Sequence, residues 1–275
     1  MASTVNPSYL EEKARDIRRQ VLTMIHHAKS GHPGSSLSVV EIMTVLFYHE
    51  IKHDPKNPNW ANRDRFILSK GHAAPTLYAI LADQGYFQST DLDSFRAIGG
   101  HLQGHPSRKS TPGVESTGSL GQGLSMGCGL AYAIKNLDHG SNRVYVLLGD
   151  GELNEGQIWE AAMFASHYNL DNLIAIVDRN NFQFVGQTES VMALEPLAAK
   201  WSAFGWYVEE VSDGNDVSAL ITALENCKDV LMPKLILAKT IKGKGVSFME
   251  NTHIWHGTAP NDKEFEQAMA ELRAK

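Results

Sequence analysis

The sequence contains little cysteine and no excess of positive charge. The first feature bears on the redox compartment of the protein, and the second on its binding partners. Its 275 residues include two cysteines, Cys128 and Cys227, which form neither a CxxC pair nor a disulfide framework. A reducing compartment is therefore expected. Acidic residues outnumber basic ones by 31 to 25, which gives a net charge of −6 at pH 7. Such a chain has no general attraction for nucleic acid or for an anionic membrane surface.

Long apolar runs and nucleotide-binding signatures are also missing. No stretch approaches the roughly eighteen apolar residues that a membrane-spanning helix needs, and residues 1–16 are polar, without the apolar region of a secretory signal. We therefore expect a cytoplasmic protein. The glycines of residues 118–123 do not follow the GxGxxG spacing, and Gly243-Lys244 lacks the Ser or Thr of a P-loop. Nicotinamide and nucleoside-triphosphate cofactors are therefore disfavoured.

The sequence predicts one α/β domain over residues 1–275, because 43% of its residues are apolar and short apolar runs alternate with helical periodicities. This alternation is typical of a doubly wound, mostly parallel sheet flanked by helices. The predicted strands are 65–68, 144–148, 173–177, 206–211 and 235–240. The predicted helices are 9–29, 38–51, 76–84, 91–97, 122–137, 155–168, 196–204, 217–227 and 262–275.

Two motifs stand at the ends of neighbouring predicted strands. The triplet Gly-Asp-Gly at 149–151 directly follows one strand, and Asn180 follows the next, thirty residues after Asp150. A strand–helix–strand crossover brings both strand ends to the same edge of a parallel sheet, so we expect these two side chains to face a common crevice. One carboxylate, one amide oxygen and a backbone carbonyl suit a Mg²⁺ ion that takes its other ligands from a diphosphate. Gly149 and Gly151 would let the backbone approach the phosphates.

Four of the twelve histidines lie in glycine-containing loops, where functional sites are often built. They are His32 in Ser-Gly-His-Pro-Gly, His72 in Ser-Lys-Gly-His, His105 in Gln-Gly-His-Pro and His256 in Trp-His-Gly. Imidazoles can bind phosphate oxygens and move protons near neutral pH. For each ring alone a structural role is as plausible as a catalytic one, but the four together indicate a polar cleft. His101 and His105 stand in a glycine-broken segment and make a poor zinc pair.

These motifs, in this order, resemble those of the thiamine-diphosphate enzymes, and most closely the N-terminal half of transketolase. The resemblance covers nearly the whole chain. The matching stretches are 30–34, 64–72, 104–106, 112–123, 149–156, 178–186 and 254–260.

The resemblance implies a role for each matching residue. Asp150, the Asn180 side chain and the Phe182 carbonyl would bind Mg²⁺, which Ca²⁺ or Mn²⁺ could replace. Besides Asp150 and Asn180, the residues implied to contact thiamine diphosphate are His72, Gly118, Ser119, Leu120, Gly149, Gly151, Glu152 and His256. The four loop histidines would bind sugar hydroxyls and assist proton transfer, and Glu155 would link cofactor sites across a subunit interface. Ser119 departs from the pattern, because many members have proline there.

The largest departure is length, because a full transketolase chain is more than twice as long. The missing part includes the pyrimidine-binding domain and its glutamate. We therefore expect the N-terminal subunit of a split transketolase, which transfers a two-carbon ketol unit from a ketose phosphate to an aldose phosphate. It would be active only with a separate C-terminal subunit, in an α2β2 heterotetramer. Segments 38–51 and 122–137 are candidate interface surfaces, although they could equally well only cover the sheet.

Three alternatives stay open. The chain could be a subunit similar to deoxyxylulose-phosphate synthase or to the α chain of an α-ketoacid dehydrogenase. It could also be a non-catalytic cofactor-binding module. The Ser-Gly-His-Pro-Gly motif and residues 64–72 favour transketolase over the two other enzymes.

Overall fold

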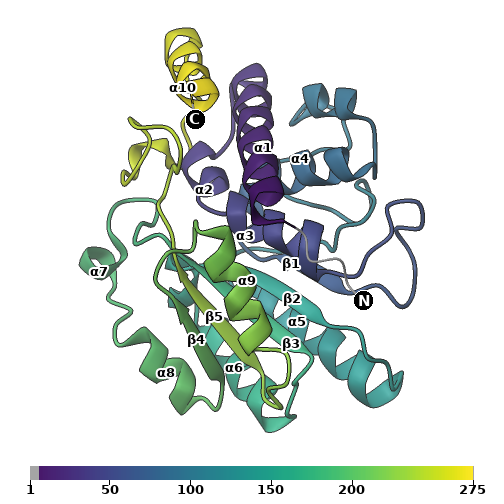
Figure 1. The fold of residues 1–275 in the computed structure, drawn as a ribbon. Coiled ribbons are helices and arrows are strands. Elements are labelled where there is room, and N and C mark those ends of the chain that lie inside the picture. Colours follow the sequence, from purple (N-terminus) through teal and green to yellow (C-terminus); the bar gives the residue numbers. More distant parts are fainter. Residues whose placement is uncertain (1–5, 275) are drawn as a thin grey trace.

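The computed structural model describes residues 6–274 and is built around a five-stranded sheet in the order β1-β2-β3-β5-β4 (Figure 1). Every pair of neighbouring strands is parallel. All seven residues of β3 are buried, as expected for a strand covered on both faces. The strands are β1 Arg65–Leu68, β2 Val144–Gly149, β3 Leu173–Arg179, β4 Tyr207–Val211 and β5 Lys234–Lys239.

Helices cover both faces of the sheet, which confirms the predicted doubly wound arrangement (Figure 1). Successive side chains of a strand point to opposite faces of the sheet. In β2, Tyr145 and Leu147 belong to one buried cluster, whereas Val144 and Val146 belong to the other. The first cluster includes residues of α1 Pro7–Ala28, α3 Val40–Val45, α4 Ala74–Gln84, α9 Val217–Asn226 and α10 Asp262–Ala274. The second includes residues of α5 Gln122–Tyr132, α6 Gly156–His167 and α8 Leu197–Ala203.

Segment 38–51 is not one helix. A short helix, α2, begins at Pro33, inside the glycine-proline segment that ends α1. Proline is well suited to a first helical position, where its missing N–H has no intrahelical partner in any case. A separate α3 follows, and then a π-helical turn, Leu46–Glu50.

Other boundaries also differ from prediction. Segment 91–97 forms a 3₁₀ turn, Ser89–Ser94, in place of an α-helix, and α7, Thr188–Val191, was not predicted. The terminal helix is found as α10, although residue 275 and residues 1–5 of the predicted polar N-terminus lie outside the described residues. The remaining short turns are Gly71–Ala73, Ala133–Leu137, Gly151–Asn154 and Ile254–His256.

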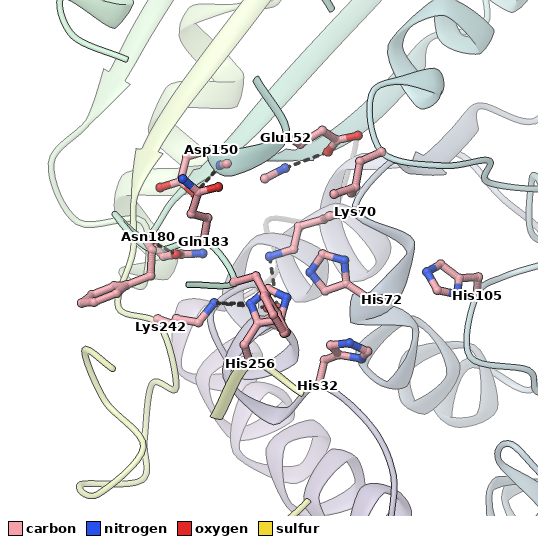
Figure 2. A pocket seen from close by; sticks show the side chains of 16 residues that line it. His32, Lys70, His72, His105, Asp150, Glu152, Asn180, Gln183, Lys242 and His256 are labelled. Atoms are coloured by element: carbon pink, nitrogen blue, oxygen red, sulfur yellow. Dashed lines mark hydrogen bonds between the residues drawn. The ribbon is translucent and has the colours of Figure 1, made fainter. Parts of the chain in front are cut away.

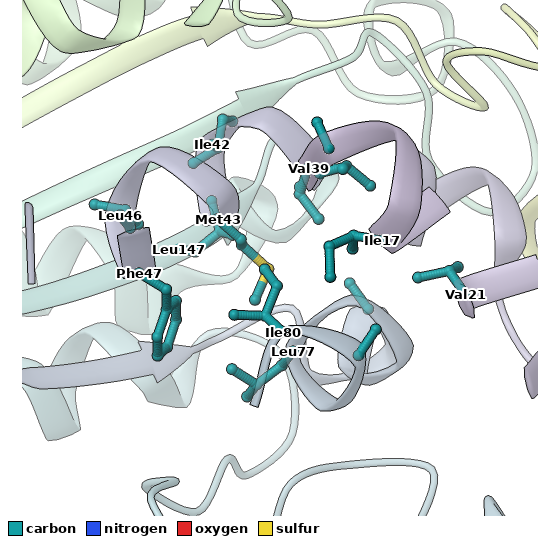
Figure 3. Packing of buried hydrophobic residues seen from close by; sticks show 14 of the residues in the cluster. Ile17, Val21, Val39, Ile42, Met43, Leu46, Phe47, Leu77, Ile80 and Leu147 are labelled. Atoms are coloured by element: carbon teal, nitrogen blue, oxygen red, sulfur yellow. The ribbon is translucent and has the colours of Figure 1, made fainter. Parts of the chain in front are cut away.

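The two segments considered as interface surfaces have different surroundings. Every residue of α3 is buried, and its Ile42 and Met43 pack among α1, α4 and β2 (Figure 3). An interface on α3 is therefore excluded, and the interpretation that this helix covers the sheet is correct. By contrast, α5 exposes Met126 beside the face that packs on the sheet.

Two of the three glycines in α5 have different surroundings, so we expect the same substitution to have opposite effects on stability at these two positions. A Cβ at Gly127 would lie 2.5 Å from Val146 Cγ2, whereas one at Gly129 would meet nothing within 4 Å. We expect Gly127→Ala to lower the free energy of unfolding by about 1–2 kcal/mol through overpacking. Gly129→Ala should raise it by up to about 1 kcal/mol through helix propensity. Urea unfolding of both variants tests this, and equal effects would contradict the packing of α5 on β2.

Within residues 6–274, the helices are all too short or too polar to cross a lipid bilayer.

Candidate active site at the carboxyl ends of the strands

A cavity of about 300 Å³ opens at the carboxyl ends of β1, β2, β3 and β5 (Figure 2). Ligands commonly bind at this edge of an open parallel sheet. The loop that follows each strand supplies a polar side chain to the cavity, namely Lys70 after β1, Asp150 after β2, Asn180 after β3 and Lys242 after β5. The remaining lining residues are His32, Ser35, His72, His105, Leu120, Gly149, Gly151, Glu152, Phe182, Gln183, Phe184 and His256.

Asp150 and Asn180 lie next to one another because β2 and β3 are adjacent and in register, with Gly149 opposite Asp178. One carboxylate oxygen of Asp150, Oδ2, accepts the Asn181 N–H at 2.6 Å and an Arg179 N–H at 3.1 Å. Burial, followed by the charge of Asp178, raises the pKa of Asp150 to about 6. The neighbouring donors therefore compensate its negative charge only in part.

The potential metal ligands around Asp150 are all oxygen atoms. The Asn180 Oδ1 accepts the Phe182 N–H at 3.0 Å, and within residues 6–274 no group donates to the Phe182 carbonyl oxygen. Carboxylate, amide and carbonyl oxygens are the ligands that Mg²⁺ and Ca²⁺ prefer. Among the described residues, no three His, Cys, Asp or Glu side chains are grouped so that they could hold a metal ion by themselves. A cation here would thus need further ligands from a bound molecule.

A buried ion pair supports the Asn180 side of the cavity. Asp178 is fully buried and accepts hydrogen bonds from Lys70 Nζ, from Ser38 Oγ at 2.7 Å and from Asn180 Nδ2 at 2.8 Å. Burial alone would raise the pKa of Asp178, but Lys70 and the hydroxyl donors, Thr240 among them, lower it overall. This network orients the Asn180 amide so that its Nδ2 points to Asp178. Sequence reasoning gave Lys70 and Asp178 no role, although each lies at the end of a buried strand.

The structure brings all four predicted histidines to this one cavity (Figure 2). The ring centroids of His32 and His72 are 5.1 Å apart, those of His32 and His256 5.5 Å, and those of His72 and His256 5.2 Å. Burial and then nearby cations lower the pKa of His32 to about 4 and that of His256 to about 3. The pKa values of His72 and His105 are also lowered, chiefly by burial. All four rings are therefore neutral at pH 7.

Lys242 is a further cavity residue that sequence reasoning missed. Its ammonium group is buried and lies 3.2 Å from His256 Nδ1 and 3.4 Å from Ser35 Oγ. Burial, followed by the charge of Lys70, lowers its pKa to about 8. Its position after the last predicted strand, in a loop rich in Gly and Lys, was the available signal. Lys70, whose charge is paired with Asp178, and Lys242 place two ammonium groups on this wall of the cavity.

Glu152 lines the cavity, but its carboxylate is occupied by protein donors. It accepts hydrogen bonds from the Gly121 N–H at 2.8 Å, the Gly149 N–H at 3.0 Å and the Ser69 hydroxyl. It therefore joins the loops that follow β1 and β2 to the start of α5. A direct contact of Glu152 with a cofactor stays a prediction, whereas a bracing role is evident from these bonds.

The other predicted residues divide between the cavity and its surroundings. Leu120 lines the cavity and is 43% exposed, whereas Gly118 and Ser119 lie outside its lining. Gly151 also lines it, and a Cβ there would meet Gln183 Cβ at 2.8 Å, so the backbone is open to a close approach only with glycine. Glu155 is exposed at the start of α6, away from the cavity and near Gly121. Its surface position suits a contact with another chain.

The histidines predict how stability depends on pH. A histidine whose folded-state pKa lies below the unfolded value of about 6.5 makes the unfolded chain bind more protons between those two values. Stability is therefore lost as the pH falls from about 6.5 towards 4. Urea titrations at pH 7 and at pH 5 give the free energy of unfolding at each pH. We expect the decrease from pH 7 to pH 5 to be smaller for His256→Gln than for the wild type. An equal loss, or the same change with the exposed His253→Gln, would contradict the neutral state of His256.

Comparisons with known proteins place this geometry in a family. The family model described as the thiamine diphosphate binding domain of transketolase matches residues 10–274. The 6-deoxy-6-sulfo-D-fructose transketolase subunit of Clostridium sp. (strain MSTE9) is 44% identical over 265 residues, covering 96% of each chain. An apulose-4-phosphate transketolase subunit from Actinobacillus succinogenes is 43% identical over 273 residues, and the match covers 98% of each chain.

A solved structure shows the same fold. Transketolase from Campylobacter jejuni superposes with a TM-score of 0.92 at 37% identity, over 98% of this chain but only 43% of that one. The sheet, the Gly-Asp-Gly turn and the cavity histidines thus occur in a chain similar end to end to transketolase subunits and to part of a longer transketolase. The chain belongs to the transketolase family and carries its thiamine diphosphate-binding domain.

Proposed function

We propose that this chain is the cofactor-binding subunit of a two-chain transketolase, which transfers a two-carbon ketol unit from a ketose phosphate to an aldose phosphate. The observation that carries the proposal is the similarity, over 96% of both chains, to a protein named as a transketolase subunit. The four neutral histidines in one cavity support it, because such rings can bind the hydroxyl and carbonyl oxygens of a sugar.

The proposed cofactors are thiamine diphosphate and Mg²⁺, with Ca²⁺ or Mn²⁺ as substitutes. Asp150, Asn180 and the Phe182 carbonyl would hold the metal ion, and the incompletely compensated charge of Asp150 suits a cation there. The Gly151 backbone and the ammonium groups of Lys70 and Lys242 would face the diphosphate. When bound, thiamine diphosphate supplies the nucleophilic carbon of the reaction.

The remaining residues of this chain would orient the substrate and exclude water. Leu120 would contact the apolar side of the cofactor, with Gly118 and Ser119 next to it in the loop. His32, His72, His105 and His256 would donate or accept hydrogen bonds at sugar oxygens, where such contacts stabilise developing charge.

The second polypeptide would supply the pyrimidine-binding half of the site. This chain spans only 43% of the Campylobacter jejuni transketolase, so more than half of that chain has no counterpart here. The rim of the cavity carries the exposed apolar side chains Leu120 and Phe184, which a partner could cover. Glu155, exposed at the start of α6 outside the cavity, would contact a neighbouring subunit. We propose an α2β2 assembly, a single domain for residues 1–275 and a cytoplasmic location.

Reconstitution tests the proposal. The purified chain, a candidate C-terminal subunit, and their mixture are assayed for ketol transfer and for pyruvate decarboxylation, with thiamine diphosphate and Mg²⁺ present. The donors tested should include sugars with phosphate and with sulfonate groups, because the two similar subunits are named for substrates of these kinds. We expect ketol transfer by the mixture alone. Rapid transfer by the chain alone would exclude a required partner, pyruvate decarboxylation would favour the other enzyme families, and cofactor binding without turnover would favour a non-catalytic module.

A further inference from the structure

Two cavity histidines present the same ring nitrogen to a cationic side chain. Arg96 Nη2 lies 3.4 Å from His32 Nδ1, and Lys242 Nζ lies 3.2 Å from His256 Nδ1. A guanidinium group has only donors, and so has an ammonium group. In both contacts the histidine Nδ1 must therefore accept the hydrogen bond, and the ring proton of the neutral imidazole must be on Nε2.

We propose that Arg96 is a positioning residue which, in parallel with Lys242 at His256, holds His32 as the Nε2–H tautomer, so that both rings offer a hydrogen-bond donor to the oxygen atoms of a sugar in the cavity. The tautomer follows from the contacts alone. The role of these two Nε2–H donors in sugar binding rests on the proposed function.

The surroundings of Arg96 hold its guanidinium in place. The other terminal nitrogen donates to Ser30 Oγ at 2.6 Å, and a Cβ at Gly104 would lie 3.0 Å from Arg96 Nε. The Arg96 backbone N–H donates to the Leu102 carbonyl at 2.8 Å, and its φ is 59°, a value that residues other than glycine rarely adopt. Arg96 thus joins the loop that carries His32 to the loop that carries His105. Strain of this kind is retained where surrounding contacts over-determine the backbone.

The charges around both rings also favour the neutral form. The groups that act on His32 are Arg96, His105, Lys242 and Lys70, and those that act on His256 are Lys242, His32 and Lys70. All of them disfavour a second proton on the ring. A neutral imidazole with its Nδ1 engaged has one function left to offer the cavity, and this is the Nε2–H donor.

The tautomer can be measured in the isolated chain. Histidine side-chain ¹H–¹⁵N correlation spectra at pH 6.5, where Lys242 is charged and both rings are neutral, report which ring nitrogen carries the proton, with assignments from His32→Gln and His256→Gln. We expect pyridine-type Nδ1 and pyrrole-type Nε2 signals for both rings. Arg96→Lys, which keeps a donor, should preserve the His32 pattern. Arg96→Glu, which places an acceptor there, should put a proton on His32 Nδ1 and leave His256 unchanged. A protonated Nδ1 in the wild type, or an unchanged His32 in Arg96→Glu, would overturn the proposal.

A kinetic comparison in the reconstituted enzyme tests the role. We expect Arg96→Glu to lower kcat/KM for the sugar by about 100-fold, as is typical for loss of one preorganised donor, with a change of less than about threefold in thiamine diphosphate affinity. Arg96→Lys should retain most of the activity. Normal kcat/KM in Arg96→Glu, despite a shifted His32 proton, would refute the donor role. Because the spectra need no turnover, they decide the tautomer even if the enzyme proves to have another activity.

Discussion

Asp150→Ala is expected to weaken Mg²⁺-dependent binding of thiamine diphosphate by at least about 100-fold, or roughly 2.7 kcal/mol. Asp150 is the one carboxylate among the three proposed metal ligands, and its charge is compensated only in part by Arg179 and two backbone N–H groups. Without it the cation would have two neutral oxygens from the protein. Calorimetric titration of the reconstituted enzyme with the cofactor, with Mg²⁺ and with EDTA, measures the effect.

The control is a carboxylate at the opposite end of the neighbouring strand. Asp171 precedes β3 and pairs with Lys135 at 2.7 Å, and Asp171→Asn should leave cofactor binding unchanged. Unchanged binding in Asp150→Ala would contradict the metal assignment.

Loss of the Asp150 charge should have little effect on the stability of the cofactor-free chain, in contrast to its large effect on cofactor binding. Its folded-state pKa of about 6 lies above the unfolded value of about 3.9, so ionisation of Asp150 lowers stability as the pH rises from about 4 to 6. We therefore expect Asp150→Asn to be near neutral for stability at pH 7, because removal of this penalty offsets the lost bond to Arg179. Urea unfolding at pH 7 measures it. A loss of several kcal/mol would show that Asp150 is needed for folding more than for cation binding.

Asp178→Asn is expected to lower the free energy of unfolding by about 3–5 kcal/mol, the usual cost of breaking a buried ion pair. The Lys70 ammonium, which is almost fully buried, would lose its counter-charge, and the Asn180 amide would face a second amide group in place of a carboxylate. Denaturant unfolding of the cofactor-free chain measures the loss.

A double-mutant cycle separates the ion pair from the fold around it. Lys70→Met combined with Asp178→Asn should recover a large part of the loss, because no unpaired charge then remains buried. The partly exposed Lys135–Asp171 pair is the matched control, and its single substitutions should cost about 1 kcal/mol or less. Additive losses in the Lys70 and Asp178 variants would contradict direct coupling between them.

Much of the fold could be predicted because the strands are continuous apolar runs. β2 and β3 are buried on both faces, so almost every residue in them must be apolar, and this pattern needs no knowledge of distant partners. The predicted crossover also placed Asp150 and Asn180 correctly, since adjacent parallel strands end at the same edge. Some predicted helix boundaries were wrong. The predicted helix 38–51 is in fact α3 and a π-helical turn, preceded by the separate short helix α2, which begins at Pro33.

The four loop histidines could be selected from their glycine-rich contexts, but the cations beside them could not. Lys70, Arg96 and Lys242 are far apart in the sequence, and lysine and arginine are usually exposed. Only folding brings Lys70 to Asp178 and Arg96 to His32. Their position after a predicted strand is the one local signal for Lys70 and Lys242, and Arg96 has no such signal.

The sequence by itself determined the parallel sheet, the Gly-Asp-Gly turn with its asparagine, and the presence of four loop histidines, because each depends on residues close together in the chain or on one repeated crossover. The tertiary structure alone decided which charged groups are buried, what each carboxylate contacts and which nitrogen of His32 and His256 carries the proton. These properties depend on distances of a few ångströms between segments that meet only in the folded chain, and on the loss of water around them.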